Sequence, residues 1–348
     1  MHSAKFFPLT TFVTTYAIAH LVVDAACAFL FIGVLEFSEH IVFSMLLYNA
    51  LAFVLQAPFG LLIDKKLNPK LASILGLLLV ALSFLFWNRS YVALSIISIG
   101  NALFHVGGGS LVLSLRKKKA TFSGVYVAPG GIGLALGSFL AISKPGTNLV
   151  LFPLILLILS FLLYFIKTPG FNRTRKEQSL SNYGVLLVAL IMIPIAVRSL
   201  IGLSMEFPWK ENQYWLWGLI AALALGKVFG GVLADRFGLL KVGVGGLLVS
   251  TPLLAFFSTV PLLGLAGGFV FNFTMPVTLI AILSVMPQNK GLSFGLTTVA
   301  LFIGAIPTIL GTNSWLKDDL VVFAFIMLSA LVLYGVLSFY GSIKTLKV

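Results

Sequence analysis

Charge and cysteine are both scarce in this chain. Only 9% of its 348 residues are Asp, Glu, Lys or Arg, whereas soluble proteins carry about 25%. The single cysteine, Cys27, excludes an intramolecular disulfide, and the sequence shows no Cys/His metal motif. The net charge of +13 could suggest nucleic acid, but nucleic-acid binders gather basic residues on one face of a soluble fold. So little charge indicates a chain that lies in lipid, and we expect no nucleic-acid partner.

Apolar residues make up 59% of the chain, and its mean hydropathy is +1.08. A helix needs about 20 apolar residues to cross the roughly 30 Å of hydrocarbon in a bilayer. Charged or Pro- and Asn-rich breaks divide the chain into twelve such segments. We therefore predict an all-α integral membrane protein with transmembrane helices at 9–34, 41–63, 71–87, 91–114, 120–142, 148–166, 183–205, 213–234, 242–257, 260–286, 291–312 and 320–341.

The basic residues predict how these helices are oriented, because cytoplasmic loops carry an excess of Lys and Arg. Most of the 23 Lys and Arg residues fall in loops on one side of the predicted bundle. We therefore expect a multi-pass protein of the cell membrane (inner or plasma membrane) with both termini in the cytoplasm. The opposite side holds only four basic residues, namely Arg89, Lys144, Lys210 and Lys317.

One stretch of sequence occurs twice. Gly60-Leu-Leu-Ile-Asp64-Lys65-Lys66-Leu67 returns as Gly231-Val-Leu-Ala-Asp235-Arg236-Phe237-Gly238, and each copy closes an apolar segment on the predicted cytoplasmic side. The repeat indicates a duplicated chain with two pseudo-symmetric six-helix bundles. We place the first bundle at residues 1–167, a cytoplasmic linker at 168–182 and the second bundle at 183–348.

The repeated box resembles the signature loop of the major facilitator superfamily, which implies that fold and a transporter working by alternating access. Other fragments are similar to the fosmidomycin-resistance (drug efflux) branch and extend the resemblance over most of the chain. They are Ala19-His20-Leu-Val-Val-Asp24, Gly100-Asn-Ala-Leu-Phe-His105, Gly130-Gly131-Ile-Gly133-Leu-Ala-Leu-Gly137, Val197-Arg198-Ser199 and Pro276-Val-Thr.

The chain departs from the family pattern at two places. Leu67 stands where the family has glycine in the first box, and we expect Asn68 to supply the left-handed backbone of that turn and Pro69 to begin the next helix. Drug/proton antiporters have Gly-Pro in the fifth helix, whereas this chain has Gly137-Ser138. The second departure argues against antiport.

The residues of the two boxes are predicted to gate the cytoplasmic side. Glycine lets helices approach closely, and an aspartate with its following cation at a helix end can pair across the two halves. The alternative is that both aspartates are only solvated charges at helix ends. The predicted gating residues are Gly60, Asp64, Lys65, Gly231, Asp235, Arg236 and Gly238.

Ionisable residues are costly at membrane depth, so each one suggests a function. Asp24 is the only carboxylate well inside a predicted span, His20 lies one helical turn before it, and His105 lies in the fourth span. We predict that Asp24 carries the coupling proton, with His105 or His20 sharing that role. Alternatively, Asp24 forms a permanent buried pair with Arg198 or a histidine, and His20 bonds only to a carbonyl or hydroxyl.

Two buried cations indicate where a substrate binds. Arg198 lies in the seventh span, and Lys227 lies roughly 12 Å inside the eighth, at the repeat position that Gln56 occupies in the first half. In the superfamily the first, fourth, seventh and tenth helices line the cavity, so the resemblance adds Asn272 and Thr274 to the predicted substrate-binding residues Arg198, Lys227 and Gln56. A lysine that only reaches to the interface is the alternative for Lys227.

We expect a secondary active transporter that exports a small organic compound or drug, anionic or zwitterionic in character, in exchange for protons. An uptake symporter or a facilitative uniporter is the alternative. An enzyme is not expected, because no nucleophile or metal cluster is visible, and a receptor would be expected to lose its gates. We predict no cofactor, no metal and a monomer, with the substrate, protons and the lipid bilayer as partners.

Overall fold

The computed structural model describes residues 9–35, 40–115, 119–143, 149–173 and 181–345, with side chains to residue 339. These residues are helical throughout, and no strand occurs among them. The helices are α1 (Leu9–Gly33), α2 (Ile41–Asn49), α3 (Gln56–Lys65), α4 (Pro69–Ser83), α5 (Ser90–Leu113), α6 (Lys119–Ser143), α7 (Leu151–Phe165), α8 (Asn182–Ser204), α9 (Gln213–Phe237), α10 (Leu239–Ala255), α11 (Pro261–Phe271), α12 (Thr274–Val285), α13 (Lys290–Ile309) and α14 (Asp319–Thr345).

The predicted all-α membrane fold with twelve spans is confirmed. Ten described helices or helix pairs are long and apolar enough to cross a bilayer, and α7 and α10 are shorter apolar helices. Two predicted spans are interrupted. A π-helical turn, Ala50–Val54, joins α2 to α3, and the tenth span breaks between α11 and α12 at Asn272 and Phe273.

The two boxes turn by different means. Gly238 has a φ of 93°, in the left-handed region that glycine favours. The expectation that Asn68 supplies the same conformation in the first box is wrong, because its φ of −76° and ψ of 121° are extended. Asn68 instead caps α4, since its Oδ1 accepts hydrogen bonds from the backbone N–H groups of Lys70 and Leu71. Pro69 begins α4 as predicted.

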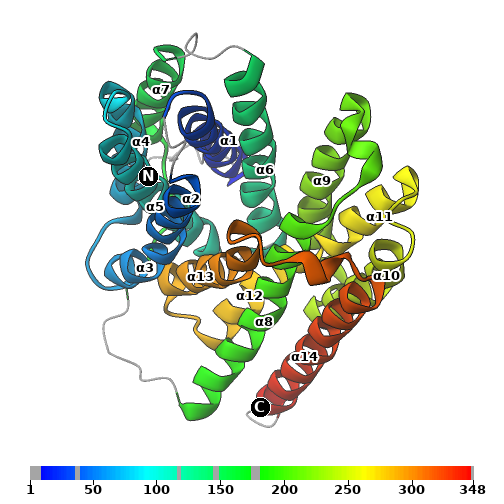
Figure 1. The fold of residues 1–348 in the computed structure, drawn as a ribbon. Coiled ribbons are helices and arrows are strands. Elements are labelled where there is room, and N and C mark those ends of the chain that lie inside the picture. Colours follow the sequence, from blue (N-terminus) through cyan, green and yellow to red (C-terminus); the bar gives the residue numbers. More distant parts are fainter. Residues whose placement is uncertain (1–8, 36–39, 116–118, 144–148, 174–180, 346–348) are drawn as a thin grey trace.

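The two halves of the chain lie side by side and meet along two equivalent helix pairs (Figure 1). In the first half α6 packs on α1, and it also packs on α9 of the second half. In the second half α13 packs on α8, and it also packs on α3 of the first half. The boundaries 1–167, 168–182 and 183–348 remain a prediction, and part of the linker (174–180) lies outside the described residues, as do Lys144 and the terminal residues.

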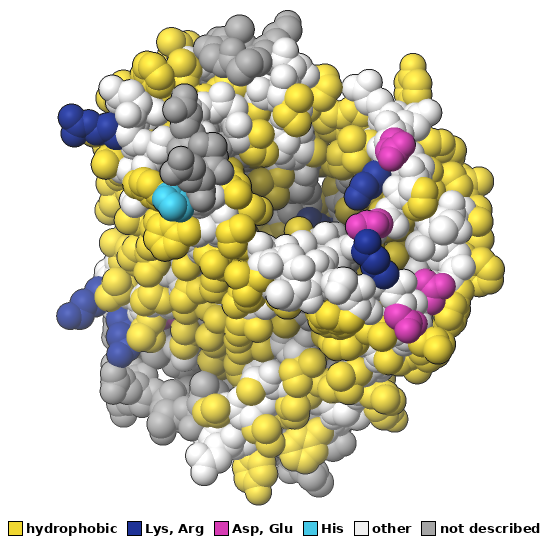
Figure 2. Space-filling view, viewed as in Figure 1, with side chains coloured by type: hydrophobic (Ala, Val, Ile, Leu, Met, Phe, Trp, Pro, Cys, Tyr) yellow, Lys and Arg dark blue, Asp and Glu magenta, His cyan; other side chains and the backbone are white. Residues whose placement is uncertain are grey.

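Apolar side chains cover much of the outer surface (Figure 2). Phe161 of α7 is 65% exposed and Leu331 of α14 is 64% exposed. Large apolar side chains this exposed are unfavourable in water but are satisfied by lipid. The surface therefore agrees with a multi-pass membrane protein.

Candidate functional site

A cavity of about 700 Å³ lies between the two halves. Figure 2 shows the hollow between them. Its lining includes Gln56 and Lys227 at one end, and Phe207 and Lys210 of the α8–α9 connection at the other. Asp24 is the only carboxylate among its described lining residues. The cavity therefore reaches towards the side opposite the two boxes, which we call the far side; the side that carries residues 60–67 and 231–238 is called the box side.

On the box side, Asp64 joins the first half to the second. Its Oδ1 accepts a hydrogen bond from the backbone N–H of Gly291 at 2.8 Å, and its Oδ2 accepts one from Leu292 at 2.9 Å. Both N–H groups belong to the first turn of α13, where they have no partner within the helix. A carboxylate at a helix N-terminus also interacts favourably with the helix dipole. Asp64 is 1% exposed, so this contact is sealed from solvent.

Asp235 makes the equivalent connection from the second half to the first. Its carboxylate accepts hydrogen bonds from the backbone N–H groups of Ala120 (3.3 Å) and Thr121 (2.8 Å) at the start of α6. The Thr121 hydroxyl donates a third bond at 2.7 Å. Each contact of Asp64 or Asp235 with the opposite helix terminus is called a lock below.

Glycines let the locked helices touch backbone to backbone. A Cβ added at Gly60 would lie 2.2 Å from the Gly291 carbonyl oxygen, and one added at Gly231 would lie 2.3 Å from the Ala120 carbonyl oxygen. Any side chain at either position would force the halves apart. The predicted gating residues Gly60, Asp64, Gly231 and Asp235 are thus brought together with the opposite half on the box side.

The cations of the boxes are placed differently from the prediction. The aspartates bind backbone N–H groups of the opposite half rather than the cation that follows the other aspartate. Arg236 lies over the ring of its neighbour Phe237 at 5.2 Å. Lys65 ends α3, and Gly238 forms the turn between α9 and α10. Backbone N–H groups of the opposite half are thus partners of both aspartates.

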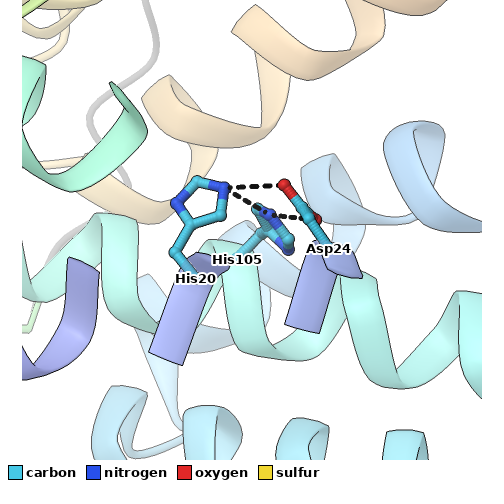
Figure 3. Close-up of side chains that lie close together, drawn as sticks. All are labelled: His20, Asp24 and His105. Carbon is cyan, nitrogen blue, oxygen red and sulfur yellow. Dashed lines mark hydrogen bonds and ion pairs between the residues drawn. The ribbon is translucent and has the colours of Figure 1, made fainter. Parts of the chain in front are cut away.

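Asp24 lies beside two imidazoles that contact each other inside the first half (Figure 3). His20 Nε2 is 3.2 Å from Asp24 Oδ2, and His105 Nε2 is 3.3 Å from Asp24 Oδ1. The two Nε2 atoms are 2.8 Å apart. All three residues line the cavity, and their side chains are 7–11% exposed. The structure therefore assembles the three residues predicted for proton coupling, and we call them the His–Asp cluster.

The hydrogen bonds of the two rings define where their protons must lie. Nδ1 of His20 is 2.8 Å from the Tyr126 carbonyl oxygen, and Nδ1 of His105 is 2.8 Å from the Asn101 carbonyl oxygen. A carbonyl only accepts, so both Nδ1 atoms carry a proton. If both rings were neutral, their Nε2 lone pairs would face each other and the carboxylate. The geometry therefore requires at least one further proton in the cluster, on an Nε2 atom.

The three donor atoms lie within 4.8 Å of one another, so a metal ion also comes into consideration. Two ligands each about 2.0–2.1 Å from a tetrahedral zinc ion are about 3.3 Å apart. The Nε2 atoms are closer, at 2.8 Å. This separation is that of a hydrogen bond and leaves too little room for a metal between the rings.

Residues that the sequence did not single out hold the cluster in place. Asn101 Nδ2 donates to Asp24 Oδ1 at 3.3 Å and to Cys27 Sγ at 3.4 Å. The Tyr126 hydroxyl donates to the His105 carbonyl oxygen at 3.1 Å. A Cβ at Gly130 would lie 2.4 Å from His20 Nε2 and 2.5 Å from Asp24 Oδ2, so only glycine fits beside them. Asn101 and Gly130 lie in the fragments that resemble the fosmidomycin-resistance branch, so this resemblance could have identified them as site residues.

Arg198 and Lys227 face the same cavity from the second half. Arg198 is 8% exposed, and its Nη1 atom is buried without a hydrogen-bond partner. The Lys227 ammonium forms no hydrogen bond or ion pair with any described residue, although the charges of Arg198 and Asp24 both act on it. The pair of Asp24 with Arg198, one of the predicted alternatives, does not form; Asp24 pairs with histidines instead.

The three polar residues predicted for the substrate site are placed unequally. Asn272 and Gln56 line the cavity. Gln56 Nε2 donates to the Ala52 carbonyl oxygen at 2.7 Å, and its Oε1 is buried without a partner. Thr274 is 1% exposed, lies outside the cavity lining and donates its hydroxyl to the Phe271 carbonyl oxygen. The structure therefore leaves Thr274 out of the site.

Helices, halves and central cavity together define the fold of major facilitator superfamily transporters. Among solved structures, the fucose:proton symporter FucP from E. coli matches with a TM-score of 0.71 and 17% identity, over 95% of this chain and 98% of that one. FucP in the outward conformation gives a TM-score of 0.72 and 16% identity, over 96% and 99%. The human organic anion transporter MFSD10 (TETRAN) gives 0.69 and 17%, over 94% and 100%.

Sequence comparison adds no closer relative: no family model matches the chain, and no curated protein matches it. At identities of 16–17%, the structural likeness shows the fold alone. The fosmidomycin-resistance branch therefore remains a prediction that rests on the sequence fragments.

Proposed function

We propose that the chain is a proton-coupled secondary transporter for a small organic compound, working by alternating access. The observation that carries the proposal is the His–Asp cluster in the wall of a cavity between two half-molecules. Coupling requires a group that must hold a proton in one conformation of the protein. This group must also lie beside the cavity that binds the substrate. FucP, which has a similar fold, is a fucose:proton symporter, and this supports the same class of function.

In this proposal the two locks form the inner gate. With the box side in the cytoplasm, as the basic loops predict, the cavity faces outwards in the state described. Breaking the Asp64 and Asp235 locks would free the starts of α13 and α6 and let the halves rock about the midplane site. Loss of the cluster proton would bring the His20 and His105 lone pairs face to face. The rings would then separate and loosen α1 from α5.

The direction of transport depends on the sign of the substrate's charge. The resemblance predicts export in exchange for protons. This requires the substrate and the proton to compete for the site, and a cationic substrate would compete with the proton of the cluster. Symport requires them to favour each other, as an anion and a proton do. The missing proline after Gly137 and the unpaired Arg198 and Lys227 favour symport as the second candidate.

Proton movement in sealed vesicles tests the proposal. Proteoliposomes that enclose a pH-sensitive dye would be offered sugars, organic anions and organic cations in turn. We expect one class of compound to move protons across the membrane, and Asp24→Asn to abolish this movement. If a compound is transported at the same rate with and without a pH gradient, and also by Asp24→Asn, the coupling proposal is wrong.

Nitrogen NMR of histidine tests the cluster without any substrate. We expect two rings with protonated Nδ1, and a protonated Nε2 on at least one of them, at neutral pH. His20→Gln and His105→Gln would assign the signals. Signals from both rings that show only Nδ1 protonated would contradict the proposed proton site.

A further inference from the structure

We propose that the substrate is an organic oxyanion whose charged group binds between Arg198 and Lys227 and whose apolar body lies in the cavity, and that it binds together with the coupling proton. This inference rests on the proposed function and names its substrate class and its sense of coupling.

The charged residues around the cavity indicate the charge of the ligand. Three cations line it, Arg198, Lys210 and Lys227, and all belong to the second half. The single carboxylate, Asp24, is already bonded to two imidazoles and to Asn101. No described lining residue is therefore left to neutralise the cations. Unpaired buried charge is unfavourable, so the cavity favours a ligand that brings negative charge.

Arg198 shows what kind of group that ligand carries. Its Nη1 atom is buried and unpartnered, although a guanidinium offers five N–H donors in a planar fork. Such a fork matches two oxygens of one carboxylate, sulfonate or phosphonate group. Lys227 lines the same cavity, and the charges of Lys227 and Arg198 act on each other, so an oxyanion between them would bring the negative charge that both lack. Lys210, at the far-side end of the cavity, lies on the way in.

The rest of the lining describes the remainder of the ligand. Most of the described lining residues are apolar, so they would hold an aliphatic or aromatic body rather than a sugar rich in hydroxyl groups. They include Phe31, Phe53, Leu223, Phe271, Met275, Phe294 and Phe302.

The cluster sets the sense of coupling. Adding a proton to the His–Asp cluster makes this side of the cavity more positive, and the charges of Asp24 and Arg198 both act on Lys227. A bound proton therefore strengthens anion binding, and by linkage a bound anion strengthens proton binding to the same extent. A ligand and a proton that favour each other cross in the same direction, which is symport.

Binding of three matched aromatic compounds tests the substrate class. Benzenesulfonate is an anion at every accessible pH, benzenesulfonamide is its neutral counterpart, and benzyltrimethylammonium is a cation of similar size. Calorimetry on purified protein should show benzenesulfonate binding at least about tenfold more tightly than the other two. Phenylphosphonate serves as a second anionic probe. Equal or tighter binding of the neutral or cationic compound, or no binding of either anion, would overturn the inference.

Variants locate the site. Lys227→Gln introduces the residue that the first half has at this position, so it should fold, and it should weaken benzenesulfonate binding by about tenfold or more. Arg198→Lys keeps the charge but loses the fork and should weaken binding less than Arg198→Gln does. Lys317→Gln, outside the cavity, is the control and should change the affinity by less than about twofold. Unchanged affinity in both cavity variants would overturn the inference.

The pH dependence tests the coupling. Because benzenesulfonate does not titrate, tighter binding at about pH 6 than at about pH 8 reports protons taken up by the protein. Asp24→Asn should lose most of this difference between the two pH values. Tighter binding at the higher pH would overturn the inference. If a neutral or cationic compound drives proton movement in the vesicles, the inference fails while the proposed function stands. If the anions bind as expected but none moves protons, the proposed function fails.

Discussion

On the box side of the two halves, residues 171 positions apart make the same kind of contact. Asp64 and Asp235 each bind the start of the fifth helix of the opposite half, and Gly60 and Gly231 each allow a backbone contact there. Around the cavity the corresponding residues differ in charge. The first half has Gln56 and the second has Lys227.

The difference extends to the first helix of each half. Helix α1 carries His20 and Asp24, whereas Ile191 and Ile195, 171 positions later in α8, are buried apolar residues. The charged residue of α8 is Arg198, a cation that lies 171 positions after Cys27. The two halves thus share the box-side contacts, whereas around the cavity the first half carries the His–Asp cluster and the second half carries the cations. The comparison indicates that two sites, one in each half, share a cavity.

The locks should be equivalent in both halves, and breaking either should have the largest effect. Gly60→Val and Gly231→Val place a side chain where a Cβ already lies 2.2–2.3 Å from the opposite backbone. We expect either change to open the cavity to the box side. The measurement is labelling of Asn272→Cys, in a Cys27→Ala background, by an impermeant maleimide added from each side of the membrane.

Labelling from the box side should rise by about tenfold or more in both variants, because a steric block of this size costs at least a few kcal/mol. Gly245→Val is the control, since nothing lies within 4 Å of a Cβ at Gly245. A large effect in one half and none in the other would show that the locks are not equivalent.

The proton site should be sensitive to the smallest possible side chain. Gly130→Ala adds a methyl group 2.4 Å from His20 Nε2 and 2.5 Å from Asp24 Oδ2, so the cluster must open. We expect proton-coupled transport to fall by about tenfold or more, because small displacements of reacting groups cause losses of this size in active sites. The dye-filled proteoliposomes described above measure it.

The matched control is the next residue along α6. A Cβ at Gly131 would meet only the Lys227 Nζ atom, at 3.6 Å, an ordinary contact. Gly131→Ala should therefore leave transport within about twofold of the native rate. If both alanine variants behave alike, helix propensity rather than the cluster explains the effect.

Exchanging the corresponding cavity residues should move the cation without destroying the site. Lys227→Gln alone should lose affinity for benzenesulfonate, as argued above. Adding Gln56→Lys places an ammonium on the opposite wall, where the buried Gln56 Oε1 already lacks a partner. We expect calorimetry to show affinity restored to within about threefold of the native chain, because one charge again balances the anion. No recovery would show that the anion binds nearer the second half alone.

The sequence predicted the fold well because lipid imposes a simple rule. A span needs a minimum apolar length, so the predicted spans 41–63 and 213–234 agree closely with helices that end at Lys65 and Phe237. The break at Asn272 and the π-helical turn at Ala50–Val54 were missed, since local irregularities do not change the hydropathy of a span.

The site was predicted only in part. The high cost of an ionisable side chain at membrane depth identified Asp24, His105 and Arg198 individually. It does not show which of these residues pair with each other. Pairing depends on which way each helix is turned, and so the Asp24 pair with Arg198 and the inclusion of Thr274 could be tested only in three dimensions. The partners of Asp64 and Asp235 could not be predicted either. They are backbone N–H groups at the start of a helix, and the amino-acid type does not distinguish such groups.

The smallest effect should come from the one place where the locks differ. Thr121 donates its hydroxyl to Asp235 at 2.7 Å, whereas Leu292 takes the corresponding position beside Asp64 and has none to donate. Thr121→Val leaves both backbone N–H bonds of the second lock intact and removes only this third one. Because Thr121 is solvent-accessible, the bond contributes about 0.5–1.5 kcal/mol.

We therefore expect Thr121→Val to raise maleimide labelling of Asn272→Cys from the box side by about two- to tenfold, well below the effect of Gly231→Val. Asp235→Asn should exceed it, since an amide weakens all three bonds. If Thr121→Val labels as fast as Gly231→Val, the threonine rather than the aspartate holds the second lock. The two halves would then close the box side by different means.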